Sequence, residues 1–126
     1  MDRVKLAAFV VTLLLPLEAG AAPSPQAARE IAGLMDALSS SRCEFNRNGA
    51  WHDAARARAH LQRKYDYLLK KDMVDTPEQF IARAASRSSI SGKAYRVRCP
   101  GKAEQDSAAW FRAQLRLLRD SAAPAP

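Results

Sequence analysis

Long hydrophobic runs, cysteine and glycine are all scarce in this chain of 126 residues. Its two cysteines and two histidines lack the close paired spacing of a zinc site, so we expect no metal. The nucleophile turn Gly-x-Ser-x-Gly of many hydrolases is missing, and so is any internal repeat. The length allows one domain with a modest core and excludes a large enzyme with a separate cofactor domain. We therefore expect no cofactor.

The N-terminus has the pattern of an export signal. A short basic region precedes an apolar segment of 12 residues, Leu6 to Leu17, and small residues follow as far as Ala21. Twelve helical residues span about 18 Å, which is short of a bilayer core of about 30 Å. We predict a signal peptide over residues 1–21, a periplasmic location and no transmembrane segment after cleavage. A retained membrane anchor is the alternative.

Basic residues outnumber acidic ones, with 20 Lys and Arg against 13 Asp and Glu, for a net charge of +7. The predicted signal peptide holds two charges of each sign, so its removal leaves this value unchanged. In an exported protein the charge favours anionic envelope surfaces, such as lipid phosphates or cell-wall carboxylates, over nucleic acid. A coding bias toward Arg and Ala, without functional meaning, explains the composition equally well.

Both cysteines, Cys43 and Cys99, follow the predicted signal peptide. An even pair in an oxidising compartment predicts a disulfide. Two free buried thiols are the alternative. The disulfide would place a short strand around Cys43 and Phe45 beside a second strand in which Tyr95, Val97 and Cys99 alternate with polar residues.

Four helices are predicted between residues 26 and 121, with residues 22–25 as a linker and 122–126 as a disordered tail. The first begins near Gln26, the second covers Ala50 to Lys71, the third begins at a Thr76 capping box, and the last begins near Ser107. Together with the two strands they predict a single mainly helical α+β domain that contains a small two-stranded antiparallel element.

The periodicity of two helices gives further predictions about which side chains are buried. In the second helix, Arg58 falls inside the apolar face, so it either extends to solvent or pairs with a buried carboxylate. The opposite face is basic and carries Arg56, His60, Arg63, Tyr67, Lys70 and Lys71. The last helix is expected to bury Trp110, Phe111, Leu117 and Leu118.

A set of mostly polar residues is distributed along the chain between Phe45 and Lys102. It comprises Arg47-Asn48-Gly49, His52, His60-Leu61, Lys64, Asp75-Thr76, Glu78 to Ile81, Ala85-Ser86, Ser88 to Ile90, Gly92-Lys93, Tyr95 and Pro100 to Lys102. In these residues the chain resembles the YfeK-like family of small exported bacterial proteins of uncharacterised function. The resemblance implies a periplasmic protein and carries over no activity, substrate or catalytic residue.

These polar residues predict an anion-binding pocket. A turn of successive serines beside a glycine can present backbone N–H groups to an anion, and His60 and Lys64 lie one helical turn apart, so both could face it. The candidate binding residues are Arg47, Asn48, His60, Lys64, Ser86, Ser89 and Lys93, with Ser88 beside them. The alternative is structural: the serines cap the third helix and brace the loops, while Arg47 ties one loop to another.

Catalysis has weaker support in the sequence. Ser89 with His60 is the most sensible pair of nucleophile and base, and spacing indicates no acid that would orient His60. A ribonuclease-like pair of His52 and His60 would be about 12 Å apart along the predicted second helix. We therefore expect no catalytic residue and favour a non-catalytic binding or interaction module for an anionic envelope component or a protein partner. A small hydrolase and a purely structural protein are the alternatives.

Overall fold

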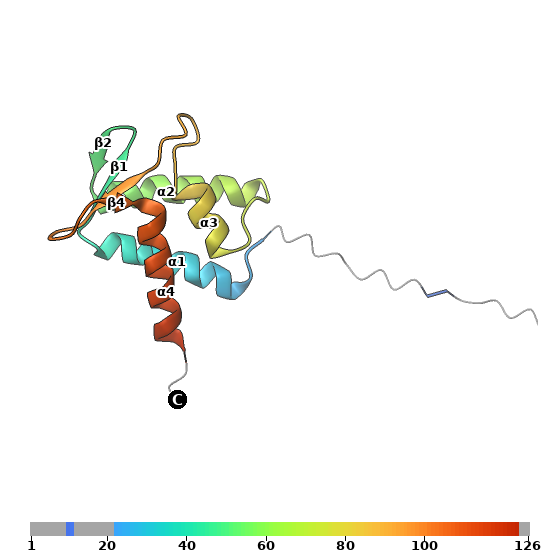
Figure 1. The fold of residues 1–126 in the computed structure, drawn as a ribbon. Helices are drawn as coiled ribbons and strands as arrows, with labels where there is room; N and C mark the ends of the chain where they lie inside the picture. The colour runs from blue at the N-terminus through green and yellow to red at the C-terminus, as the bar shows by residue number, and fades with distance from the viewer. Residues whose placement is uncertain (1–9, 12–21, 124–126) are drawn as a thin grey trace, which may run out of the picture.

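The computed structural model describes residues 10–11 and 22–123, and the predicted signal peptide lies almost wholly outside this part of the chain (Figure 1). Residues 124–126 of the predicted tail also lie outside it. The described residues form four helices and four short strands, in the order α1 (Pro25–Ser40), β1 (Glu44–Arg47), β2 (Ala50–His52), α2 (Ala54–Lys70), α3 (Pro77–Ala84), β3 (Arg96–Arg98), β4 (Gln105–Asp106) and α4 (Ser107–Ala122). The predicted class, a mainly helical α+β domain, is confirmed.

The strands form one antiparallel sheet in the order β2-β1-β3-β4. The predicted pairing of β1 with β3 is present, and β2 and β4 extend the sheet from two strands to four. The turn between β1 and β2 consists of Asn48 and Gly49, both with positive φ (51° and 86°). Two such residues in a two-residue loop match the twist of the flanking strands, which explains the Asn-Gly sequence.

The start of the second helix differs from the prediction. Ala50 to His52 are the strand β2, and α2 begins at Ala54. Asp53 is the cap: its carboxylate accepts a hydrogen bond from the backbone N–H of Arg56 at 2.8 Å. The hairpin turn directs residues 50–52 back along β1, so the helix cannot begin before this cap.

The predicted disulfide between Cys43 and Cys99 is present. Cys43 precedes β1 and Cys99 follows β3, and the pairing of Glu44 with Arg98 places the two cysteines opposite each other with Cα atoms 4.2 Å apart. The bond therefore joins two neighbouring strands at one end of the sheet. It indicates an oxidising, extracytoplasmic compartment.

The core lies between the helices and one face of the sheet. Phe111 of α4 is fully buried and its ring contacts those of Phe45, Phe80 and Trp110, with centroids 6.2, 6.4 and 4.9 Å away. Leu117 does not join this core, contrary to expectation, because its side chain is 58% exposed.

The structure also shows which partners Arg58 contacts. Its guanidinium donates hydrogen bonds to the hydroxyl of Ser39 at 2.7 Å and to the carboxylate of Asp36 at 3.1 Å. The Asp36 side chain is 71% exposed. Of the two alternatives, the structure therefore shows the first: Arg58 extends toward solvent, and its partner is an exposed carboxylate on α1 rather than a buried one.

No helix in the described part of the chain is both long and apolar enough to cross a membrane.

Candidate functional site

An open groove of about 860 Å³ lies along α2, beside the end of α3 and the loop of residues 86–94. We call it the basic groove. It is lined by Arg47, Asn48, His60, Arg63, Lys64, Tyr67, Leu68, Met73, Ala82, Arg83, Arg87, Ser88, Ser89, Ile90, Gly92 and Tyr95. Five of these side chains are cationic and none is a carboxylate.

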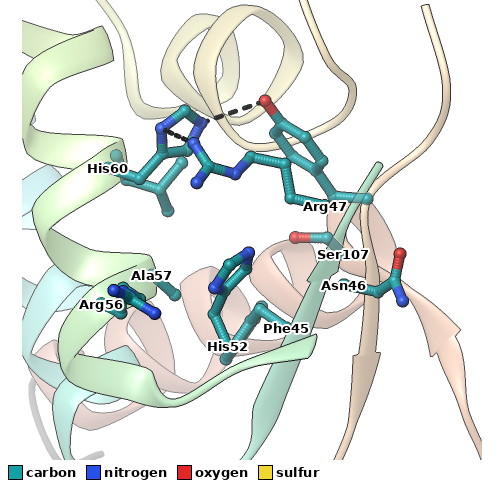
Figure 2. A pocket seen from close by; sticks show the side chains of 10 residues that line it. Phe45, Asn46, Arg47, His52, Arg56, Ala57, His60 and Ser107 are labelled. Atoms are coloured by element: carbon teal, nitrogen blue, oxygen red, sulfur yellow. Dashed lines mark hydrogen bonds between the residues drawn. The ribbon is translucent and has the colours of Figure 1, made fainter. Parts of the chain in front are cut away.

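His60 is held between an arginine and a tyrosine at one end of the groove. Nη1 of Arg47 lies 2.5 Å from Nδ1 of His60, and Nε2 of His60 lies 3.2 Å from the hydroxyl of Tyr95; Figure 2 draws both contacts as dashed lines. A guanidinium only donates hydrogen bonds, so Nδ1 must accept. The proton of the neutral imidazole is then on Nε2, which donates to Tyr95.

Lys64 reaches the same hydroxyl. Its ammonium group donates to the oxygen of Tyr95 at 3.1 Å and to the backbone carbonyl of Arg87 at 3.0 Å, and it lies 4.9 Å from the centre of the Tyr95 ring. The Tyr95 oxygen thus accepts from both His60 and Lys64. Because a phenol has two lone pairs and one proton, its own O–H is left to donate elsewhere.

The electrostatics follow from this crowding of cations. Burial, Arg47, Lys64 and Arg63, in that order, lower the pKa of His60 from 6.5 to about 4. Burial and Arg47 also lower the pKa of Lys64. None of the ion pairs between described residues includes Arg47 or Lys64. The groove is therefore a region of uncompensated positive charge.

The lowered pKa of His60 predicts a loss of stability in mild acid. Between about pH 6.5 and pH 4 the unfolded chain binds a proton at His60 that the folded protein does not, so the free energy of unfolding falls as the pH drops. Urea unfolding of the protein and of a His60→Gln variant at several pH values in this range measures the effect.

His60→Gln should lose less stability than the unmodified protein over this range, and His52→Gln, which keeps His60, should lose as much as the unmodified protein. An equal loss in all three proteins would show that His60 is not held neutral by its neighbours.

The serines of the loop form a brace around Ser88. Its buried hydroxyl accepts hydrogen bonds from the backbone N–H groups of Ile90 and Ser91, each at 3.2 Å, and from the Asn48 amide at 3.4 Å. The Ser91 hydroxyl donates back to Asn48 at 2.6 Å. These contacts tie the loop to the turn between β1 and β2.

Four backbone N–H groups of this loop are used within the loop itself. Those of Ile90 and Ser91 bond to the Ser88 hydroxyl, that of Gly92 bonds to the Ser88 carbonyl, and that of Lys93 bonds to the Ser91 hydroxyl. These four groups are therefore not free to bind an anion, and we expect the side chains of the groove to supply most of the donors.

The candidate residues from the sequence separate into two groups. Arg47, Asn48, His60, Lys64 and Ser89 line the basic groove, together with Ser88. Two lie outside its lining: Ser86, whose hydroxyl donates to the carbonyl of Ile81 near the end of α3 at 2.6 Å, and the exposed Lys93.

The candidate residues from the sequence did not include four contributors to the groove, Tyr95, Arg63, Arg83 and Arg87. Tyr95 was assigned to a half-buried strand and appeared in the family motif. A buried tyrosine hydroxyl needs a hydrogen-bond partner, and this requirement was the available signal. Nothing in the local pattern distinguished Arg63, Arg83 and Arg87 from solvated surface arginines.

The geometry gives little support to hydrolysis by Ser89 and His60. Both ring nitrogens of His60 contact other partners, and a pKa of about 4 makes the imidazole a weak base at neutral pH. The Ser89 hydroxyl makes no hydrogen bond to His60 among the described contacts. His60 is therefore better suited to position Tyr95 than to accept a proton.

The geometry also gives little support to a pair of histidines that act on one phosphate. His52 lies on β2, which removes the helical spacing assumed for the pair. Both histidines border a small cavity of about 30 Å³ between the hairpin and α2 (Figure 2). This volume suits one or two water molecules and excludes a nucleotide. In the described part of the chain, no three His, Cys, Asp or Glu side chains gather in a metal-binding group.

Comparison with known proteins places the chain in a family. The model of a family of unknown function, DUF5329, matches residues 25–119. The chain is 38% identical over 92 residues to the uncharacterized protein YfeK of Salmonella typhimurium strain LT2. The aligned region covers 72% of this chain and 75% of that protein. No solved structure matches. The resemblance to YfeK-like proteins is thus confirmed, and the chain belongs to the DUF5329 family.

Proposed function

We propose that the protein is a non-catalytic periplasmic module that binds an anionic component of the cell envelope in the basic groove. The export-type N-terminus and the disulfide support the location. One observation carries the binding role. Arg47, Lys64 and Tyr95 lie together in the groove, and each still has an N–H or O–H group that can donate a hydrogen bond.

The hydrogen-bond inventory defines what the ligand must supply. Arg47 uses one of its five N–H groups on His60, and Lys64 uses two of its three on Tyr95 and Arg87. The Tyr95 hydroxyl accepts twice and keeps its proton to donate. The ligand atoms that meet these three groups must therefore be hydrogen-bond acceptors, as the oxygens of phosphate and carboxylate groups are.

Electrostatics support the same ligand class. Partial burial of Arg47 and Lys64 without a carboxylate costs free energy that a bound anion would offset. The lowered pKa of Lys64 reflects this cost. An anion between the two cations would return the pKa of Lys64 toward its usual range.

Binding is tested by thermal unfolding with inorganic phosphate, glycerol phosphate, sulfate and cell-wall fragments, at low and physiological salt. A ligand at 100 times its dissociation constant adds about 2.7 kcal/mol, which raises the unfolding midpoint by several degrees. Lys64→Gln and Arg47→Gln should each weaken binding of glycerol phosphate by about tenfold or more, because each removes a hydrogen bond from a charged donor.

Lys102→Gln is the matched control, because Lys102 is exposed and lies near the disulfide, outside the groove. It should leave the affinity within about twofold, since a distant surface charge is screened at physiological salt. The proposal fails if no anion of the panel shifts the midpoint at low salt, or if Lys102→Gln weakens binding as much as Lys64→Gln does.

A further inference from the structure

We infer that the partner of the basic groove is the surface of an anionic lipid bilayer, with the side chain of Ile90 inserted among the acyl chains. This inference rests on the proposed function and identifies the source of the anion as lipid phosphate.

The first observation is a concentration of exposed apolar side chains. Within residues 22–123 the exposed large hydrophobic side chains are Tyr67, Met73, Ile90 and Leu117. Three of the four, all except Leu117, line the basic groove. Single exposed apolar residues are ordinary, but several together at one surface indicate an interaction site.

The second observation is how Ile90 is presented. Its side chain is 98% exposed, at the tip of a loop whose backbone is bonded to the buried hydroxyl of Ser88. Asn48 fastens this loop to the turn between β1 and β2, and Figure 1 shows both projecting from the same end of the molecule. The fold therefore holds an isoleucine outward and leaves no described residue to cover it.

The third observation is the charge around this apolar tip. Arg63, Lys64 and Arg87 line the groove beside Ile90, and Lys93 lies in the same loop. Tyr67 carries Lys71 over its ring at 5.9 Å. An exposed apolar tip on a groove that also carries cations and a tyrosine is complementary to a bilayer surface, which has acyl chains inside and anionic phosphates at the boundary.

Charge and exposure together favour a bilayer over an acidic peptide. A peptide would bury its own apolar side chains within the groove, but the Ile90 side chain is 98% exposed and forms no apolar pocket with its described neighbours. A bilayer can accept a side chain that projects in this way, because its apolar interior lies beyond the layer of phosphates.

The test is co-sedimentation of the purified protein with phosphatidylcholine vesicles, with and without phosphatidylglycerol. Binding is expected only to the anionic vesicles and should weaken as salt rises. Ile90→Ser should lower the partition coefficient by about tenfold or more, as expected for loss of a fully buried isoleucine. Leu117→Ser, at an exposed leucine outside the groove, should change it by less than about twofold. Every variant has the same N-terminus, so the comparison reports on the folded domain.

Fluorescence of an Ile90→Trp variant, with the unmodified protein as the background for Trp51 and Trp110, provides a second readout that reports insertion and not binding alone. The emission maximum should move to shorter wavelength with anionic vesicles and stay unchanged with neutral ones, because insertion removes the indole from water.

The outcomes separate this inference from the proposed function. If glycerol phosphate binds at Lys64 and anionic vesicles do not sediment the protein, the bilayer is excluded and the anion site stands. If vesicle binding is unchanged in Ile90→Ser, or the Ile90→Trp emission does not move, insertion is excluded. If a poly-glutamate peptide binds in an Ile90-dependent way and vesicles do not, the surface recognises protein. Failure with every soluble anion and with vesicles would remove both proposals.

Discussion

Replacing both Cys43 and Cys99 with alanine is expected to lower the free energy of unfolding by about 4 kcal/mol. The disulfide closes a separation of 56 residues, and opening it restores that conformational freedom to the unfolded chain. Small domains are stable by about 5–15 kcal/mol, so the loss is a large share of the total. For a domain of this size the unfolding midpoint should fall by at least about 15 °C.

Thermal and urea unfolding of the double variant, of each single variant and of the reduced protein measure this effect. The reduced protein should resemble the double variant, because both lack the covalent link between Cys43, just before β1, and Cys99, just after β3. A loss below about 1 kcal/mol would mean that pairing of β1 with β3 already holds these residues together in the unfolded ensemble.

Phe111→Ala should destabilise the protein by about 3–5 kcal/mol. The Phe111 side chain is fully buried, and it contacts Phe45 of β1, Phe80 of α3 and Trp110 of α4. Removing the ring leaves a cavity where α4, α3 and the sheet meet, and these elements cannot all close around it at once. The urea midpoint should fall while the slope of the transition stays unchanged.

Leu117→Ala is the matched control on the same helix. Its side chain is 58% exposed, so the variant should stay within about 0.5 kcal/mol of the unmodified protein. Similar losses in Phe111→Ala and Leu117→Ala would contradict the arrangement of α4 in the core.

Much of the fold was predictable because several helices begin at local signals. Ser24 caps α1 and Thr76 caps α3, in each case with a proline at the next position. The hydroxyl of Thr76 accepts from the backbone N–H of Gln79 at 3.1 Å, as a capping box requires. The pairing of β1 with β3 was also predictable, because the two cysteines connect these strands.

The errors arose where two local signals competed. Trp51 fits the helical period of the residues after it, so periodicity alone predicts helix where the structure has β2. The Asn48-Gly49 turn was the stronger signal, because it predicts a hairpin whose second strand begins at Ala50. On α4, Trp110 and Leu117 lie about 20° apart around the axis, so periodicity cannot separate them. Trp110 packs on Phe45 and Phe111, whereas Leu117 lies two turns further along and is exposed.

The candidate site was only partly predictable for a related reason. Spacing on α2 places His60 and Lys64 on one side of a helix, and both do contact Tyr95. That Arg47 donates to His60 depends on how the hairpin packs against α2, which no local pattern contains. The exposure of Ile90 likewise depends on the fixing of its loop by Asn48, a contact between residues 40 or more positions apart.

In this account the basic groove binds anions through Arg47, Lys64 and Tyr95, whose remaining hydrogen-bonding capacity is to donate. The most direct test of this claim is a titration of the isotope-labelled protein with glycerol phosphate at low salt, followed by two-dimensional NMR. The predicted result is a saturable set of shifts confined to Arg47, His60, Lys64, Arg87 and Tyr95, and absent from Lys64→Gln. Shifts centred on the arginines of α4, or spread evenly over the basic surface without saturation, would contradict it.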